Sequence, residues 1–267
     1  MQGSGRPVTI ITGASAGIGR ELALHYAEKG SNLVLAARGA EELEKVAQAC
    51  RTFGVSVVAQ PCDVAQREDN EALVRRTVAE FGRLDTLILN AGISMWSTFE
   101  ALQDLKQAEH IMQVNFWGAV YATRAALPHL RQSQGRLVAV SSLTGKTGVP
   151  TRTLYGASKH AMVGFFDALR IELMGSGVSI TVICPGFVAT GVRRHAVGPD
   201  GKPLGESPVQ EDKVMSAETC ARIIYRAAQK RKREVIMTLR GKLGIFLRMF
   251  LPGLIDRMAK KAIETGR

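Results

Sequence analysis

The chain has 267 residues, of which 46% are hydrophobic, so it can bury a substantial core in one large domain and is not intrinsically disordered. Four cysteines and five histidines are scattered without Cys-x-x-Cys or metal-ligand spacing, which excludes a disulfide scaffold and predicts no bound metal. The net charge is +11, but twelve basic and three acidic residues within 226–267 supply +9 of it, which argues against a nucleic-acid-binding protein. We find no leader-like or bilayer-spanning stretch and expect a cytoplasmic protein.

Short β-branched segments alternate with longer helical patterns along the chain. Strands are predicted at residues 8–12, 32–37, 55–60, 84–90, 136–141, 178–184 and 234–238. Helices are predicted at residues 17–29, 40–53, 66–81, about 102–132, 153–174 and 217–232. Apolar strands separated by helices are typical of a parallel sheet buried on both faces. We therefore predict a Rossmann-type α/β fold, a doubly wound parallel sheet of about seven strands, with ligands bound at the carboxyl ends of the strands.

One long stretch, residues 186–213, has three prolines and no regular periodicity. A long loop in a compact domain is more often a functional lid than an accident. We expect its part 191–208 to be mobile without ligand and to become ordered over the bound substrate. The single domain is predicted to cover residues 1–239 and to include this lid.

Residues 240–267 are predicted to form a basic amphipathic helical extension. Residues 242–251 place four apolar side chains on one helical face: Leu243, Phe246, Leu247 and Phe250. Pro252 and Gly253 are expected to end this helix, and a second helix follows over 254–263. So much apolar surface should not stay in water on a monomer. Three partners remain open: the rim of the chain's own substrate pocket, a second subunit of a homodimer or homotetramer, or an anionic membrane in peripheral contact.

The first predicted strand runs into a glycine-rich turn, Thr12-Gly13-Ala14-Ser15-Ala16-Gly17-Ile18-Gly19. Glycine is needed where the backbone turns sharply and approaches a pyrophosphate, and the following helix N-terminus supplies free N–H groups for the anion. Between the first strand and the first helix of a βαβ unit, this pattern predicts a dinucleotide site rather than an ordinary tight turn.

The end of the second predicted strand indicates which dinucleotide binds. NAD sites usually place an acid there, about 20 residues after the glycine turn. This strand instead ends at Arg38. A guanidinium can bond a 2′-phosphate that a carboxylate would repel, so Arg38 favours NADP(H) over NAD(H), with Ser15 as a second candidate contact. The alternative is a solvated arginine after a strand.

Ser142, Tyr155 and Lys159 form the candidate catalytic group. Tyr155 and Lys159 are four residues apart at the start of a predicted helix, so they share one face. A phenol is a poor proton partner at neutral pH, and a nearby ammonium lowers its pKa by stabilising the phenolate. Ser142, just after the fifth strand, is placed to hold the substrate oxygen.

With these motifs in this order, the chain resembles the short-chain dehydrogenase/reductases from residue 8 to about residue 238. The resemblance also covers Asp63-Val64, Asn90-Ala91-Gly92, Asn115, Tyr155-Gly156-Ala157-Ser158-Lys159 and Pro185-Gly186-Phe187-Val188-Ala189-Thr190. One position departs from the pattern: Ala16 stands where many NADP-dependent members have Lys or Arg, so the cofactor choice depends mainly on Arg38.

This resemblance implies a role for each matching residue. The cofactor would be held by Gly13, Ser15, Gly17, Ile18, Gly19, Arg38, Asp63, Val64, Asn90, Ala91, Gly92, Tyr155, Lys159, Pro185, Gly186, Val188 and Thr190. Asp63 and Val64 would contact the adenine, Lys159 the nicotinamide ribose, and Val188 and Thr190 the carboxamide. Asn115 would complete the catalytic group by holding a water that links Lys159 to solvent.

The function so implied is an NADP(H)-dependent oxidoreductase that interconverts a ketone or aldehyde and an alcohol. The resemblance points to hydroxysteroid-dehydrogenase-like members and hence to a lipophilic small molecule. Five mostly apolar residues lie where the pockets of the family usually are: Met95, Trp96, Leu143, Pro150 and Phe187. The alternative is a non-catalytic NADP(H)-binding sensor of the same fold, which would have no need of a positioned Tyr–Lys pair.

Overall fold

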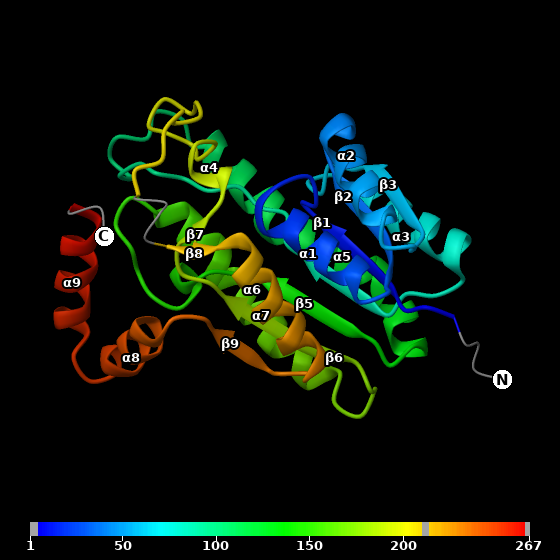
Figure 1. Ribbon diagram of the computed structural model, residues 1–267. Helices are drawn as coiled ribbons and strands as arrows, with labels where there is room; N and C mark the ends of the chain where they lie inside the picture. Colours follow the sequence, from blue (N-terminus) through cyan, green and yellow to red (C-terminus); the bar gives the residue numbers. More distant parts are fainter. Residues whose placement is uncertain (1–4, 210–213, 265–267) are drawn as a thin grey trace.

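Seven parallel strands form the central sheet, in the order β3-β2-β1-β4-β5-β6-β9 (Figure 1). They are Val8–Thr12 (β1), Asn32–Ala37 (β2), Val57–Pro61 (β3), Thr86–Leu89 (β4), Arg136–Val140 (β5), Ser179–Cys184 (β6) and Glu234–Ile236 (β9). The computed structural model describes residues 5–209 and 214–264, so the last four residues of the predicted lid and both chain ends lie outside the described residues. The predicted doubly wound sheet is confirmed, and the strand order reverses between β1 and β4, where such sheets bind ligands.

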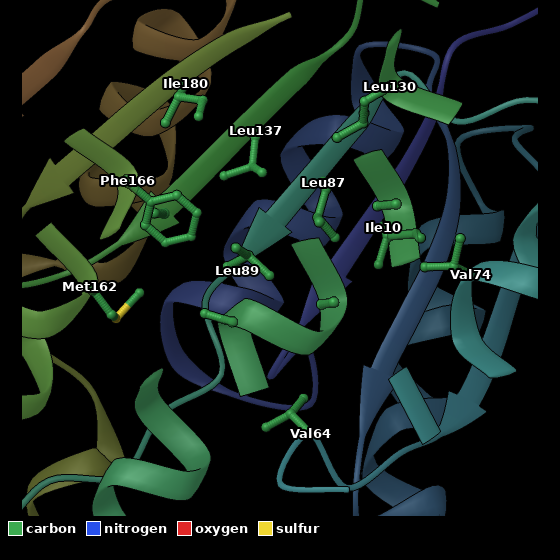
Figure 2. Packing of buried hydrophobic residues seen from close by; sticks show 14 of the residues in the cluster. Ile10, Val64, Val74, Leu87, Leu89, Leu130, Leu137, Met162, Phe166 and Ile180 are labelled. Carbon is green, nitrogen blue, oxygen red and sulfur yellow. The ribbon is translucent and has the colours of Figure 1, made fainter. Parts of the chain in front are cut away.

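Two layers of helices cover the sheet. One face carries α1 (Gly17–Glu28), α2 (Ala40–Arg51) and α7 (Ala217–Gln229), and the other carries α3 (Arg67–Phe81), α5 (Gly118–Gln132) and α6 (Thr153–Glu172). Successive strand residues point to opposite faces, so Ile11 packs in the first layer and Ile10 in the second. Figure 2 shows the second layer, where Leu137 of the sheet lies near Phe166 of α6. The strands are apolar on both sides because both layers bury them.

The long helix predicted for about 102–132 is in fact three segments. It begins at α4 (Lys106–Met112), passes through one π-helical turn over Gln113–Trp117, and continues as α5. The prediction was wrong in its start and in its uniformity, because hydrophobic periodicity does not distinguish one wide turn inside a helix. π-turns often occur at functional sites, and this one carries Asn115.

Backbone hydrogen bonds join the predicted lid to the segment that follows β4. Its first residues form β7 (Val188–Ala189), which pairs with β8 (Met215–Ser216), and then a 3-10 turn over Gly191–Arg193. Val197 exchanges backbone hydrogen bonds with Ser94 and Trp96. The ordering of this segment on ligand binding stays a prediction.

The C-terminal extension consists of two helices, α8 (Leu239–Arg248) and α9 (Pro252–Glu264), beside the body of the molecule (Figure 1). The predicted boundaries were wrong by a few residues. The Thr238 hydroxyl accepts the N–H of Gly241 and so caps an earlier start, and Pro252 begins the second helix instead of preceding it, as suits proline at a first helical position. No helix among the described residues is both long and apolar enough to cross a membrane.

Candidate active site

The glycine turn between β1 and α1 is packed so closely that side chains are excluded. A Cβ on Gly19 would lie 2.0 Å from the carbonyl oxygen of Gly13, and a Cβ on Gly13 would lie 2.8 Å from Cα of Ala91. Gly13 also has φ of +66°, a conformation that favours glycine. The bare backbone and the start of α1 therefore face the carboxyl edge of the sheet, as an anion-binding turn requires.

Hydrogen bonds join this turn to the end of β4. Asn90 Nδ2 donates to the carbonyl oxygens of Thr12 and Gly13 at 3.0 and 3.2 Å, and the N–H groups of Asn90 and Ala91 donate to the Thr12 hydroxyl. A Cβ on Gly17 would meet the Thr190 side chain at 3.1 Å, so the segment after β6 closes the same site. Thr12, the first residue of the glycine-rich motif, to which the sequence analysis gave no role of its own, thus holds the two strand ends together.

Arg38 lies at the same edge of the sheet. The N–H of Ala14 in the glycine turn donates to the carbonyl oxygen of Ala36 in β2 at 3.1 Å, two residues before Arg38. The Arg38 side chain is exposed. Ser15 is half-buried in the turn itself. The structure therefore places both candidate 2′-phosphate contacts at one end of the dinucleotide turn.

The residues that are expected at the adenine and the carboxamide are held in place mainly by contacts with the protein backbone and by burial. Asp63 Oδ1 accepts the N–H of Ala65 at 3.0 Å, and Val64 is buried against Gly118. Pro185 and Val188 are buried after β6, and Gly186 packs on Thr238, where a Cβ would lie 3.2 Å from the methyl group. Ile18 and Gly92 are half-buried and exposed respectively, at the same edge.

Tyr155 and Ser142 come together as predicted. Ser142 follows β5 by two residues, and its hydroxyl accepts the N–H of Thr144 at 3.2 Å, which caps a 3-10 turn over Leu143–Gly145. Burial raises the pKa of Tyr155, while side-chain hydrogen bonds with Ser142 and Thr144 and the charge of Arg152 act in the opposite direction. The Tyr155 phenol is therefore protonated at neutral pH and can serve as a proton donor.

Lys159 lies one turn along α6 from Tyr155, yet the expected electrostatic effect is not what the structure shows. Its Nζ donates to the carbonyl oxygen of Val140 at 3.0 Å and lies 5.8 Å from the centre of the Tyr155 ring. Burial lowers the pKa of Lys159 to about 8. Arg152 is a second cation at a similar distance, since its Cζ lies 5.7 Å from the same ring centre, and its charge acts against the rise in the pKa of Tyr155.

Asn115 occupies the π-turn between α4 and α5. Its Oδ1 accepts the N–H of Ile93 at 2.8 Å, and its Nδ2 donates to the Ile93 carbonyl oxygen and to the Ser158 hydroxyl, both at 3.0 Å. A Cβ on Gly92 would lie 3.0 Å from Asn115 Oδ1 and 3.5 Å from Lys159 Nζ, so the two side chains approach the same point. The structure thus brings all four predicted catalytic residues to one place.

Arg152 is the residue of this site that sequence reasoning missed. It precedes α6, is buried, and stacks 4.3 Å above the Trp96 ring. Of the five expected pocket residues, Trp96 and Phe187 lie beside it, while Met95 is buried under the lid with Val197. Pro150 is exposed, and Leu143 contacts the start of α8. An arginine just before a helix resembles an ordinary solvated charge, so no pattern in the chain could have indicated its burial.

Comparison with known proteins agrees with this geometry. The sequence profile of the family described as short chain dehydrogenase matches residues 7–199. The 11-beta-hydroxysteroid dehydrogenase 1A of Arabidopsis thaliana is 38% identical over 269 residues, or 97% of this chain and 76% of that protein. The 11-beta-hydroxysteroid dehydrogenase of Pinus massoniana is 37% identical over 256 residues, 93% of this chain and 72% of that protein.

The chain belongs to the short chain dehydrogenase family. It is a dehydrogenase that acts on CH–OH groups and is similar to hydroxysteroid dehydrogenases, which favours an enzyme over the sensor alternative.

Solved structures agree on the fold. An alcohol dehydrogenase from the archaeon Thermococcus sibiricus, complexed with 5-hydroxy-NADP, superposes with a TM-score of 0.76 at 26% identity, over 87% of this chain and 96% of that one. A short chain dehydrogenase/reductase from Burkholderia phymatum in complex with NAD superposes with a TM-score of 0.82 at 24% identity, over 95% of this chain and 96% of that one.

Proposed function

We propose that this dehydrogenase uses NADP(H) to interconvert a ketone or aldehyde and an alcohol on a lipophilic small molecule. The observation that carries the proposal is the side-chain hydrogen bond between Tyr155 and Ser142, next to buried Lys159. The same sheet edge holds the glycine turn, whose lack of side chains leaves room for a pyrophosphate against bare backbone. These residues fit a nicotinamide dinucleotide.

Each catalytic side chain has a task that its surroundings support. In reduction, Tyr155 donates its proton to the substrate oxygen, and in oxidation it accepts that proton. Ser142 donates a hydrogen bond that orients the same oxygen. Lys159, whose Nζ donates to the carbonyl oxygen of Val140, is placed to hold the nicotinamide ribose, and Asn115 positions the backbone of Ile93 and the hydroxyl of Ser158. A bound nicotinamide supplies or takes up the hydride.

The preference for NADP(H) is supported by Arg38. The two solved neighbours differ, since one was crystallised with an NADP derivative and the other with NAD. Arg38 is exposed at the end of β2, where a 2′-phosphate accepts a bidentate pair of hydrogen bonds from a guanidinium. Asp63 follows the next strand, but its Oδ1 is already engaged by the N–H of Ala65.

A screen for oxidation of NADPH tests the function. Ketones and aldehydes of increasing apolar size, including 11-oxo steroids suggested by the names of the relatives, are each offered with NADPH and with NADH. We expect consumption of NADPH with at least one apolar carbonyl compound and none with the Tyr155→Phe protein. Lack of turnover with every carbonyl and alcohol and either cofactor, in a protein that still binds NADPH, would contradict the proposal.

We propose that a second subunit covers the apolar face of the C-terminal extension. The alternative partner is an anionic membrane. α8 already contacts the pocket rim at both of its ends, since Gly241 packs on Leu143 and Arg248 donates to the carbonyl oxygen of Lys146 at 2.7 Å. The apolar face is nevertheless exposed, with 55% of Phe246 and 67% of Phe250 accessible to solvent. The pocket rim therefore does not account for this face, and a partner outside the chain is needed.

A further inference from the structure

Arg152 is a buried cation without a matching anion. Only 5% of the residue is accessible, and its Nη1 donates to the Ser94 hydroxyl at 2.9 Å. Its Nε and Nη2 are buried without a hydrogen-bond partner among the residues that the structure describes. Burial lowers its pKa to about 10, and no acidic side chain is among the groups that act on it. Buried guanidinium groups are normally paired, so this one is expected to meet its counter-ion from outside the chain.

The local backbone makes this placement more unfavourable still. Thr151, just before Arg152, has φ of +64°, a left-handed conformation that is rare and strained for a β-branched residue. Arg152 itself is the residue at the N-terminal cap of α6, where the helix dipole favours a negative charge over a positive one. An arrangement that opposes stability in this way is typical of a functional site.

Aromatic side chains surround the guanidinium, and one of its buried edges lacks a hydrogen-bond partner among the described residues. The Arg152 Cζ lies 4.3 Å from the centre of the Trp96 ring and 5.7 Å from those of Tyr155 and Phe187. With Nη1 engaged by Ser94, the unpartnered atoms are Nε and Nη2. These two nitrogens present parallel N–H groups on one edge, the geometry that binds both oxygens of a carboxylate.

The other anions of the proposed reaction do not fit this edge. The phosphates of the dinucleotide are expected at the glycine turn and at Arg38, whereas Arg152 packs on Trp96, Tyr155 and Phe187, which belong to the substrate side. If Arg152 served only to act on the Tyr155 phenol, its second edge would not need to be left without a partner. An arginine paired with a carboxylate of the chain could do this at a lower desolvation cost.

We propose that the substrate is an oxo or hydroxy acid whose carboxylate binds side-on to Nε and Nη2 of Arg152 while its reacting oxygen lies at Tyr155 and Ser142. The inference rests on the proposed function and narrows its substrate class. The apolar body of the substrate packs on Trp96 and Phe187, so the molecule is amphipathic, with one charged end close to the reaction centre.

Matched pairs of acids and esters test this proposal. 4-Formylbenzoate and its methyl ester, and a series of straight-chain oxo acids of increasing length with their methyl esters, are assayed with NADPH. The variants are Arg152→Leu, which removes the charge, and Arg152→Lys, which keeps the charge but loses the paired N–H edge. Arg76→Leu is the matched control, because Arg76 is an exposed arginine of α3, outside the predicted lid and the candidate active site.

We expect the wild-type protein to prefer at least one acid over its ester. In Arg152→Leu, kcat/KM should fall by about ten- to a hundredfold more for that acid than for its ester, because both substrates share any effect of the charge on Tyr155 and only the acid loses a contact to its carboxylate. Arg152→Lys should restore part of the loss, and Arg76→Leu should behave as wild type. Equal use of acids and esters by the wild type, or equal losses for both in Arg152→Leu, would overturn the proposal.

A binding measurement separates this proposal from the proposed function. Benzoate should raise the melting temperature of the wild-type and Arg76→Leu proteins but not that of Arg152→Leu, and this needs no turnover. If no carbonyl compound is reduced but benzoate protects through Arg152, the function fails and the anion site stands. If carbonyl compounds are reduced without acid preference and benzoate has no effect, the anion site fails and the function stands. Should Arg152→Leu not fold, the same comparison is made with Arg152→Lys, whose unchanged acid preference would overturn the side-on contact.

Discussion

The carboxyl edge of the sheet and the C-terminal extension depart from ordinary globular structure in opposite ways. At the sheet edge, Arg152 and Lys159 bury charge beneath aromatic rings and strand ends. In the extension, Phe246 near the end of α8, and Met249 and Phe250 in the turn after it, expose apolar surface beside basic residues. Folded proteins usually do neither.

Each departure identifies what is still to be supplied from outside the chain. A buried cation without an anion is stabilised by a charged ligand, whereas an exposed apolar face is stabilised by a large apolar surface. The first region is therefore shaped for a small molecule and the second for a protein or a membrane. The predictions below should affect one region and leave the other unchanged.

The largest effect should come from Tyr155→Phe. The change removes the proton donor but no packing group, so kcat should fall by roughly 10²- to 10⁴-fold while NADPH affinity, measured by fluorescence titration, stays within a few-fold. Tyr225→Phe is the control, because Tyr225 lies on α7 among the rings of His25 and Tyr26. A Tyr155→Phe protein with near-normal kcat would remove Tyr155 from the mechanism.

Arg38→Asp should reverse the cofactor preference. The wild-type protein should bind NADPH more tightly than NADH, and the variant should lose about ten- to a hundredfold in NADPH affinity, because a charge-assisted pair of hydrogen bonds is replaced by repulsion. Arg76→Asp, an exposed arginine on α3, makes the same charge change away from the turn. Equal dissociation constants for NADPH and NADH in the wild type would rule out the role of Arg38.

Lys159→Met should change how stability depends on pH. Burial lowers the pKa of Lys159 from 10.5 to about 8, so between these values the unfolded chain binds more protons at this position than the folded one. The penalty of burying the ammonium is complete below pH 8 and is relieved as the pH rises towards 10.5.

The difference in unfolding free energy between the wild-type and Lys159→Met proteins should therefore shift by about 2–3 kcal/mol in favour of the wild type from pH 7 to pH 10. Denaturant unfolding of the cofactor-free proteins measures it. The cysteines and other tyrosines titrate in both proteins and cancel in the difference, and Lys232→Met, an exposed site, should show no shift. A constant difference across this range would mean that Lys159 keeps an ordinary pKa.

The smallest effect on catalysis should come from the extension. The double change Phe246→Ser and Phe250→Ser should leave kcat within about twofold, since neither residue lies at the sheet edge, yet it should convert a dimer or tetramer into a monomer in light scattering. Truncation after Leu239 should also give a monomer. Phe53→Ser, at an exposed phenylalanine near the end of α2, should leave the oligomer intact.

Vesicle co-sedimentation decides between the two partners of the extension. A subunit interface predicts no binding to vesicles that contain an anionic phospholipid. A chain that is monomeric and binds anionic but not neutral vesicles, and loses this binding in the double variant, would show that a membrane covers the face instead.

Local regularities in the sequence were enough to predict the strands and helices in their order along the chain, the glycine turn and the grouping of Ser142, Tyr155 and Lys159. Strand and helix periodicity repeats within a few residues, and Tyr155 and Lys159 share a helical face at any position of that helix. Parallel strands then bring their carboxyl ends to one edge, so residues after different strands meet without further information.

Only the tertiary structure decided which charge acts on Tyr155, where Asn115 lies, and how much of α8 is exposed. Arg152 is buried because Trp96 and Phe187, 56 residues before and 35 residues after it in the chain, close over it. Such burial depends on packing between segments distant in sequence, which periodicity does not encode. Distant contacts also determine the wide turn at Asn115, where hydrogen bonds to Ile93 and Ser158 position the side chain. The exposure of Phe246 and Phe250 likewise follows from tertiary structure, since no segment of the described chain covers them.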